Sequence, residues 1–237
     1  MRELVDEVGR LRGRATRAEC EHEKPPHANR ELARYAAPVR LLVYDRTCVH
    51  DRGRLSTVWS AGSRLYRMLG RIDASRGVES WDEAFEWLAS HDEPIREIQY
   101  WGHGKWGRAL VREDSFDADS LAGHHRDAIA AVRERLAPDA LVWFRTCETF
   151  GAHAGHDFAQ RLADTLGARV AGHTYIIAFH QSGLHGLAPG MRPDWSPEEG
   201  LASGTAADPK RALWSKRTAP RTVTALTGKI PPAWFTS

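Results

Sequence analysis

The sequence predicts an α/β domain built on a doubly wound, mostly parallel β-sheet. Strand-like and helix-like patterns alternate between residues 39 and 175, as expected for a parallel sheet with helices on both faces. Two of the apolar runs are followed directly by residues typical of catalysis, His103 after one and Cys147 after the other. A chain of 237 residues has room for one such domain with extensions.

Four short apolar runs are the expected strands, and they cover residues 39–44, 95–100, 140–144 and 169–172. Between them, apolar side chains recur at the three- and four-residue spacing of amphipathic helices. The expected helices cover residues 55–69, 81–88, 121–136 and 158–166. Ser80 is expected to cap the second helix, and Gly167 to end the last one.

The chain divides into three segments by composition. Residues 1–37 are rich in charge and carry a weak helical pattern, so we expect a helical leader or linker there. Residues 38–175 form the predicted α/β core. Residues 176–237 are rich in glycine and proline and are predicted to be an irregular extension packed on that core.

The overall composition excludes several classes of protein. Apolar residues make up 42% and charged residues 27% of the chain, which suits a globular core. The net charge of +2, from 33 basic and 31 acidic residues, gives no reason to expect a nucleic-acid or membrane partner. Three cysteines do not suggest a disulfide framework, and neither a signal peptide nor a membrane-spanning run is visible. We therefore expect a cytoplasmic protein.

Cys147 and His103 are the candidate catalytic pair. Ligands of open α/β sheets bind at the carboxyl ends of the strands, where both residues are predicted to lie. The start of the helix after Cys147 favours a thiolate, and His103 is available as its base. The backbone N–H groups of Gly104 and Cys147 are candidate donors to an oxyanion. The competing interpretation is that Cys147 is a small buried core residue.

These motifs resemble those of the caspase-like cysteine peptidases of clan CD, which include caspases, gingipains, separases and bacterial CHAT-type proteases. The resemblance covers roughly residues 39–174 and rests on the segments Tyr-Trp-Gly-His-Gly at 100–104, Thr-Cys-Glu-Thr-Phe-Gly at 146–151 and Gly-His-Asp-Phe-Ala at 155–159. It implies a sheet of caspase-haemoglobinase type, with His103 as general base, Cys147 as nucleophile and Gly104 as oxyanion donor. Gly102 stands where many members carry serine.

On this interpretation the protein is a thiol protease, a cysteine endopeptidase with a Cys-His dyad, that hydrolyses peptide or protein substrates without a cofactor or metal. Four further residues are predicted to contact the substrate. Arg46 follows the first strand, and Glu148 follows the nucleophile, whose pKa a close carboxylate would raise. His185 and Trp195 belong to the extension, which we expect to wall the cleft.

Three alternatives remain open on the sequence alone. Cys48 and His50 form a rival pair, but they lie too close in sequence to reproduce a dyad carried by two strands. A second alternative is that the chain is a catalytically silent caspase-like scaffold, which docks a regulatory protein partner. A metal-dependent hydrolase is the third possibility, because His153 and His156 have a spacing seen in metal sites.

Overall fold

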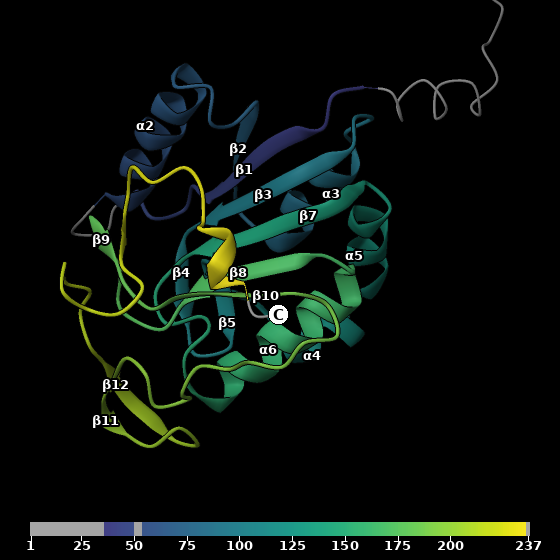
Figure 1. The fold of residues 1–237 in the computed structure, drawn as a ribbon. Helices are drawn as coiled ribbons and strands as arrows, with labels where there is room; N and C mark the ends of the chain where they lie inside the picture. Colours follow the sequence, from purple (N-terminus) through teal and green to yellow (C-terminus); the bar gives the residue numbers. More distant parts are fainter. Residues whose placement is uncertain (1–35, 50–53, 236–237) are drawn as a thin grey trace, which may run out of the picture.

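The computed structural model describes residues 36–49 and 54–235. It confirms a mixed α/β fold around a mostly parallel sheet of six strands, in the order β10-β8-β7-β3-β1-β2 (Figure 1). The strands β1, β2, β3, β7 and β8 are parallel, and only β10 runs antiparallel to its neighbour. The predicted helical leader and His50 lie outside the described residues.

The strands of the central sheet are β1 (Val39–Asp45), β2 (Ala74–Val78), β3 (Ile95–Trp101), β7 (Leu136–Arg145), β8 (Arg169–His173) and β10 (Leu184–Leu187). The helices are α2 (Leu55–Met68), α3 (Trp81–Ala89), α4 (Ala118–Ala122), α5 (Arg126–Arg133) and α6 (Ala152–Leu166), with a 3-10 turn, η1 (Pro232–Trp234), near the end. The four predicted strands are present. Ser80 accepts a hydrogen bond from the backbone of Glu83 at 3.2 Å, and Gly167 ends α6 at φ 60°, both as expected.

The helix predicted over residues 121–136 is wrong. Two short helices, α4 and α5, replace it, and Leu136 already belongs to β7. The chain breaks between them at Gly123, whose backbone is not helical. Residues between β3 and α4 form a three-stranded antiparallel sheet, for which no strand was predicted, of β4 (His103–Lys105), β5 (Arg108–Val111) and β6 (Asp114–Asp117).

Side chains alternate between the two faces of the central sheet. Leu41 and Val43 of β1 join the main core formed with α3, α5 and α6, whereas Leu42 packs with Tyr66 of α2 on the opposite face. Trp143 of β7 also points to that opposite face. The C-terminal segment packs there through Val223, Ile230, Trp234 and Phe235.

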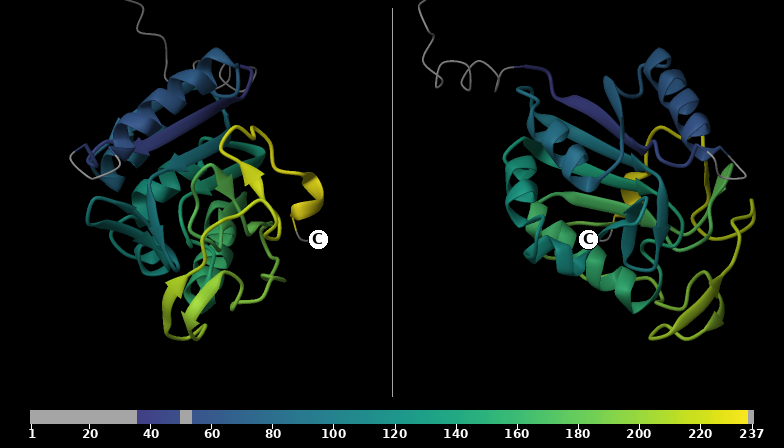
Figure 2. Two further views of the ribbon diagram at one scale, coloured as in Figure 1. Left: turned by 90° about the vertical axis from the view of Figure 1, so that its left-hand side faces the viewer. Right: turned by 180° about the vertical axis from the view of Figure 1, so that it is seen from behind.

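One face of the sheet is therefore covered by α3, α5 and α6, and the other face by α2 and the irregular C-terminal segment. Figure 2 shows that segment, in yellow, on the side of the sheet away from α3 and α5. The chain after β8 also forms two short antiparallel pairs, β9 (His180–Gln181) with β13 (Val223–Thr224) and β11 (Leu201–Gly204) with β12 (Pro209–Ala212). No helix in the described ranges is both long and apolar enough to cross a membrane.

Candidate active site

The histidine and cysteine motifs leave neighbouring parallel strands at the same edge of the sheet. Trp101, the last residue of β3, lies opposite Arg145, the last residue of β7. The segments that begin with His103 and Cys147 are consequently in contact. A Cβ atom added to Gly104 would lie 2.6 Å from the carbonyl oxygen of Cys147, which no real Cβ tolerates. Glycine at position 104 is thus required by the close approach of the two segments.

Cys147 is half-buried, whereas its neighbours from Val142 to Phe150 are all buried. Its Sγ atom lies 3.4 Å from the backbone nitrogen of Ile177, whose N–H points to the sulfur. Ile177 belongs to the predicted extension. No pattern in the sequence marks it, because its approach to the sulfur depends on the path of the loop after β8.

The turn that carries Cys147 is held by its neighbours on the β8 side. The backbone N–H of Glu148 donates to the carbonyl of Tyr175 at 3.1 Å, and that of Phe150 donates to the carbonyl of His173 at 3.0 Å. Glu148 and Ala152 have φ angles of 59° and 61°, in the left-handed region that non-glycine residues seldom occupy. The surrounding hydrogen bonds therefore fix a turn that is locally unfavourable.

An ion pair lies beside the sulfur. The Nζ atom of Lys105 is 2.8 Å from Oε2 of Glu148, which is buried. Burial raises the pKa of the Cys147 thiol above its usual value, and the nearby Glu148 charge adds to this rise. The Ile177 N–H and the Lys105 charge lower the pKa but do not offset burial. The thiol is consequently protonated at neutral pH unless a base takes its proton.

His103 is half-buried at the start of β4. The edge of its ring meets the ring of Trp59 from α2, with the ring centres 5.6 Å apart. Within the part of the chain that the structure describes, the ring in contact with His103 is that of Trp59, on the α2 side. The imidazole is thus positioned by one aromatic contact and remains partly open to solvent.

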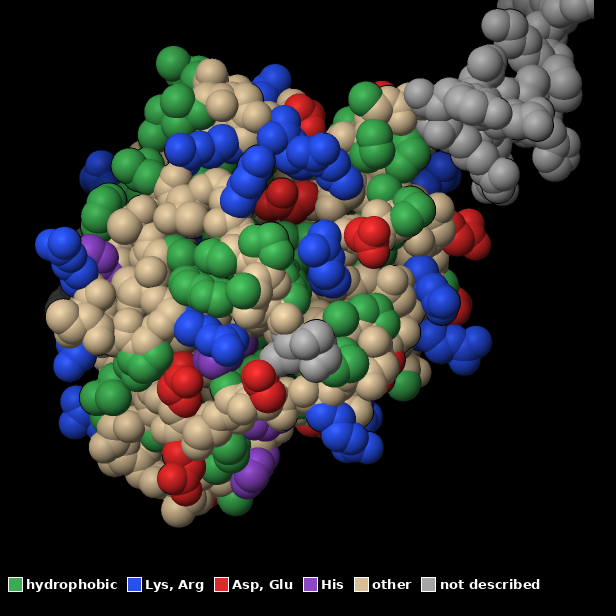
Figure 3. All heavy atoms as spheres, in the orientation of Figure 1, with side chains coloured by type: hydrophobic (Ala, Val, Ile, Leu, Met, Phe, Trp, Pro, Cys, Tyr) green, Lys and Arg blue, Asp and Glu red, His purple; other side chains and the backbone are tan. Residues whose placement is uncertain are grey.

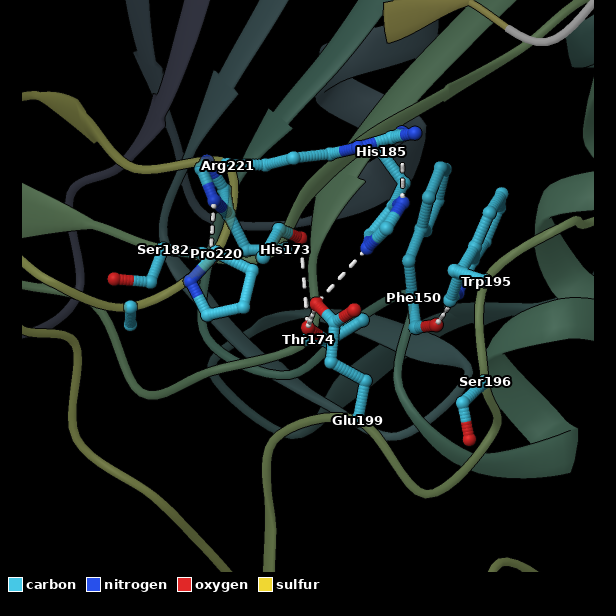
Figure 4. A network of polar contacts seen from close by, with 12 residues as sticks. Phe150, His173, Thr174, Ser182, His185, Trp195, Ser196, Glu199, Pro220 and Arg221 are labelled. Carbon is cyan, nitrogen blue, oxygen red and sulfur yellow. Dashed lines mark hydrogen bonds and ion pairs between the residues drawn. The ribbon is translucent and has the colours of Figure 1, made fainter.

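Two of the predicted substrate contacts are buried away from solvent. His185 in β10 is 2% exposed, and the Trp195 side chain is 6% exposed. Their rings stack at 4.5 Å, and the indole N–H of Trp195 donates to the carbonyl of Phe150 at 3.1 Å (Figure 4). Both residues therefore support the turn that follows Cys147 and do not line an open surface.

The other two predicted substrate contacts, Arg46 and Glu148, form ion pairs within the protein. Arg46 is half-exposed and lies 3.4 Å from Glu79 and 3.8 Å from Glu83. Glu148 is bound to Lys105, as described above. The structure thus brings the backbone of Gly104, next to His103, against that of Cys147, next to Glu148. Arg46, His185 and Trp195 belong to other contact sets.

His185 is held in one tautomer by a polar network around Glu199 (Figure 4). Arg221 can only donate, so the Nδ1 atom of His185, 3.0 Å away, accepts, and Nε2 donates to Glu199 at 2.9 Å. Thr174 donates to the same carboxylate at 2.9 Å. Burial opposes ionisation of Glu199, but these hydrogen bonds and the Arg221 charge outweigh it and hold its pKa below the usual value.

The remaining histidines near this network stay neutral. Burial lowers the pKa of His173 to about 3 and that of His156 to about 4. His156 and His153 are not part of any group of three or more metal-binding side chains among the described residues. The spacing of these two histidines is therefore not accompanied by the further convergent ligands that zinc requires.

Cys48, the rival nucleophile, is 7% exposed at the end of β1. Its thiol donates to the Oδ2 atom of Asp45 at 3.4 Å, and that buried carboxylate also accepts from the Arg112 backbone N–H at 3.3 Å. These contacts give Cys48 a structural role. An apolar cavity lies within the main core, and none of the predicted site residues lines it.

The fold and these contacts define an α/β protein with a partly exposed cysteine at the carboxyl edge of its sheet. The family model of a domain of unknown function (DUF4347) matches residues 67–183, a stretch that contains both the histidine and the cysteine motif. No curated protein matches the chain. No solved structure matches it either.

The charges beside Cys147 predict opposite effects on its reactivity. In Lys105→Met the thiol loses a neighbouring positive charge, so the midpoint pH of its alkylation should rise. In Glu148→Gln it loses a negative charge, so the midpoint should fall. The rate of iodoacetamide modification at Cys147, followed by mass spectrometry between pH 6 and about 10, measures both shifts, because only the thiolate reacts. Shifts of the same sign in the two variants would contradict the opposite effects of these two charges on the thiol pKa.

Proposed function

We propose that the protein is a caspase-like cysteine endopeptidase. His103 takes the proton from the Cys147 thiol, and the thiolate attacks the carbonyl carbon of the scissile peptide bond. The leaving amine departs with a proton from the imidazolium, and water then hydrolyses the acyl-enzyme and restores the thiol. The reaction requires no cofactor, and its substrate is a peptide or an extended segment of a protein.

The observation that carries this proposal is the contact between the two motifs. The Gly104 backbone lies directly against the carbonyl of Cys147, and the two segments leave adjacent parallel strands. Between residues 142 and 150, Cys147 is the one residue that is partly accessible to solvent. A structural cysteine requires neither the partial exposure nor the close approach of the segment that carries His103. The proposed hydrogen bond between the Cys147 thiol and the His103 imidazole forms on substrate binding, when catalytic contacts tighten.

The contacts around the sulfur suit this chemistry. The Ile177 N–H stabilises negative charge on Sγ, and Lys105 contributes a positive charge nearby. The raised pKa of the thiol gives His103 a necessary task, because little thiolate would form without a base. The N–H groups of Gly104 and Cys147 are the proposed donors to the oxyanion of the tetrahedral intermediate.

A catalytically silent scaffold is the second candidate, and a specific surface favours it. The helix α2 and the residue after it expose the apolar side chains Val58, Leu65, Met68 and Leu69. Figure 3 shows hydrophobic side chains gathered where α2 lies in Figure 1. Contiguous exposed apolar patches are typical of protein interaction sites. On this alternative, the cysteine is retained for packing and the surface docks a protein partner.

One experiment separates the two candidates. The protein is incubated with a peptide library derived from a bacterial proteome, and new peptide termini are detected by mass spectrometry. In parallel, it is treated with a peptidyl acyloxymethyl ketone, which modifies cysteine nucleophiles of peptidases. The proposal expects new termini with a shared sequence preference and a probe adduct on Cys147. Absence of both, in protein that alkylates normally with iodoacetamide, would favour the scaffold.

A further inference from the structure

A cluster of Asp114, His124 and His125 lies away from the cysteine, where the turn between α4 and α5 meets the start of β6. One nitrogen or oxygen atom from each of the three side chains lies within 4.8 Å of the others. The three come from a hairpin strand and from two adjacent positions in the helix break, so sequence spacing alone does not reveal them. Nitrogen and carboxylate oxygen together form a donor set that zinc and similar cations accept.

His125 is the observation that points to a ligand. Its side chain is 1% exposed. Nδ1 has a carboxylate oxygen of Asp82 beside it at 3.1 Å, whereas Nε2 makes no hydrogen bond with any described residue. His125 also occupies the N-cap position of α5 without forming a cap hydrogen bond, so its ring is not used there. Buried polar groups normally have partners, because an unpartnered one costs free energy. A metal ion would supply the missing partner.

The distances around the ring fit a metal-bound histidine. Nε2 lies 3.9 Å from the Oδ1 atom of Asp114, too far for a hydrogen bond but close to the spacing of about 3.4 Å between two ligands of one tetrahedral zinc. Nδ1 faces the Oδ1 atom of Asp82 at 3.1 Å. A carboxylate on the second ring nitrogen is the usual outer partner of a metal-binding histidine.

The donor atoms are also held in place before any ion binds. The second carboxylate oxygen of Asp114 accepts the Trp81 backbone N–H at 2.8 Å, which leaves Oδ1 directed to the histidine. The His125 ring packs against Phe85 and Phe116, with ring centres 5.2 Å and 6.3 Å apart. His124 is exposed, and its ring centre lies 3.8 Å from that of His125. Only the exposed ring has to adjust.

We propose that Asp114, His124 and His125 bind one divalent transition-metal ion of the zinc type, with Asp82 as the outer partner of His125. Water completes the coordination on the exposed side. The ion joins β6, α3 and the start of α5. Because β6 belongs to the same small sheet as β4, which begins at His103, the ion stabilises the sheet that carries the proposed base. The site itself does not depend on the proposed peptidase activity.

The test uses tag-free protein stripped of metal and titrated with Co(II), followed by competition with Zn(II). The proposal expects one equivalent of Co(II) with visible absorption bands and no sulfur-to-metal band in the near ultraviolet. It also expects a rise in melting temperature with Zn(II) that Mg(II) does not produce. The Cys147→Ala variant should behave like the wild type, because the thiol is not a ligand.

Matched variants locate the site. His124→Ala removes an exposed side chain, so it should fold normally and weaken binding by at least about 100-fold, since even outer-partner changes cost roughly 10–100-fold. Asp114→Asn should also weaken binding, whereas His153→Ala, which removes another exposed histidine, should not. Unchanged binding in His124→Ala and Asp114→Asn would overturn the proposal. So would no binding by the wild type.

Discussion

Replacing Cys147 with alanine is expected to reduce peptide hydrolysis to the background rate while the fold survives. The substitution removes only the sulfur atom from a half-buried side chain, and the turn is held by backbone hydrogen bonds that it does not touch. Without the nucleophile, no acyl-enzyme forms. Cys147→Ser should also be nearly inactive, because a hydroxyl group ionises far less readily than a thiol. Circular dichroism melting checks that each variant is folded.

His103→Ala is the companion variant, with Cys48→Ala as the control. Removing a general base typically lowers kcat/KM by about 10²–10⁴-fold, so residual turnover above background is expected for His103→Ala. Its activity should recover in part as the pH rises, because more thiolate then forms without the base. Cys48→Ala should keep most of its activity. Activity lost in Cys48→Ala but retained in Cys147→Ala would move the site to the end of β1.

The parts of the fold that follow from local sequence were predictable, and those that depend on distant contacts were not. Apolar runs predicted β1, β3, β7 and β8 because these strands are buried within the sheet. The strand β2 has the sequence Ala-Ser-Arg-Gly-Val and lies at the sheet edge, so it has no apolar run to detect. The strands β5 and β6 have only four residues each, too few for a periodic pattern.

The candidate site divides in the same way. The approach of the segments that carry His103 and Cys147 was predictable because each segment follows a recognisable strand, and the parallel arrangement brings these strand ends together. The approach of Ile177 to the sulfur and the pair of Lys105 with Glu148 were not, because the residues in each pair belong to different elements. The burial of His185 and Trp195 was missed for the same reason. Glycine-rich sequence around them indicated a loop, whereas β10, which carries His185, is an edge strand of the central sheet, and Trp195 packs in the main core.

Arg145 connects the sheet to that extension. This arginine precedes the cysteine by two residues and is 4% exposed, with its guanidinium 4.5 Å from the ring centre of Trp143. Burial lowers its pKa from the usual value. Its nitrogens donate to Gln181, to the Tyr66 hydroxyl and to three backbone carbonyl groups of the C-terminal segment, those of Thr224, Ala225 and Thr227. A single side chain thus satisfies several buried acceptors at once.

Arg145→Met is therefore expected to lower the free energy of unfolding by at least about 3 kcal/mol, because the buried acceptors lose their donor. Arg145→Lys should recover little of this loss, since one ammonium group cannot reach acceptors spread around a planar guanidinium. The matched control is Arg161→Met, which removes an exposed pair with Asp157 and should cost no more than about 0.5 kcal/mol. Urea unfolding followed by circular dichroism measures all three. An Arg145→Met variant as stable as Arg161→Met would show that the C-terminal segment is held by its apolar contacts and not by Arg145.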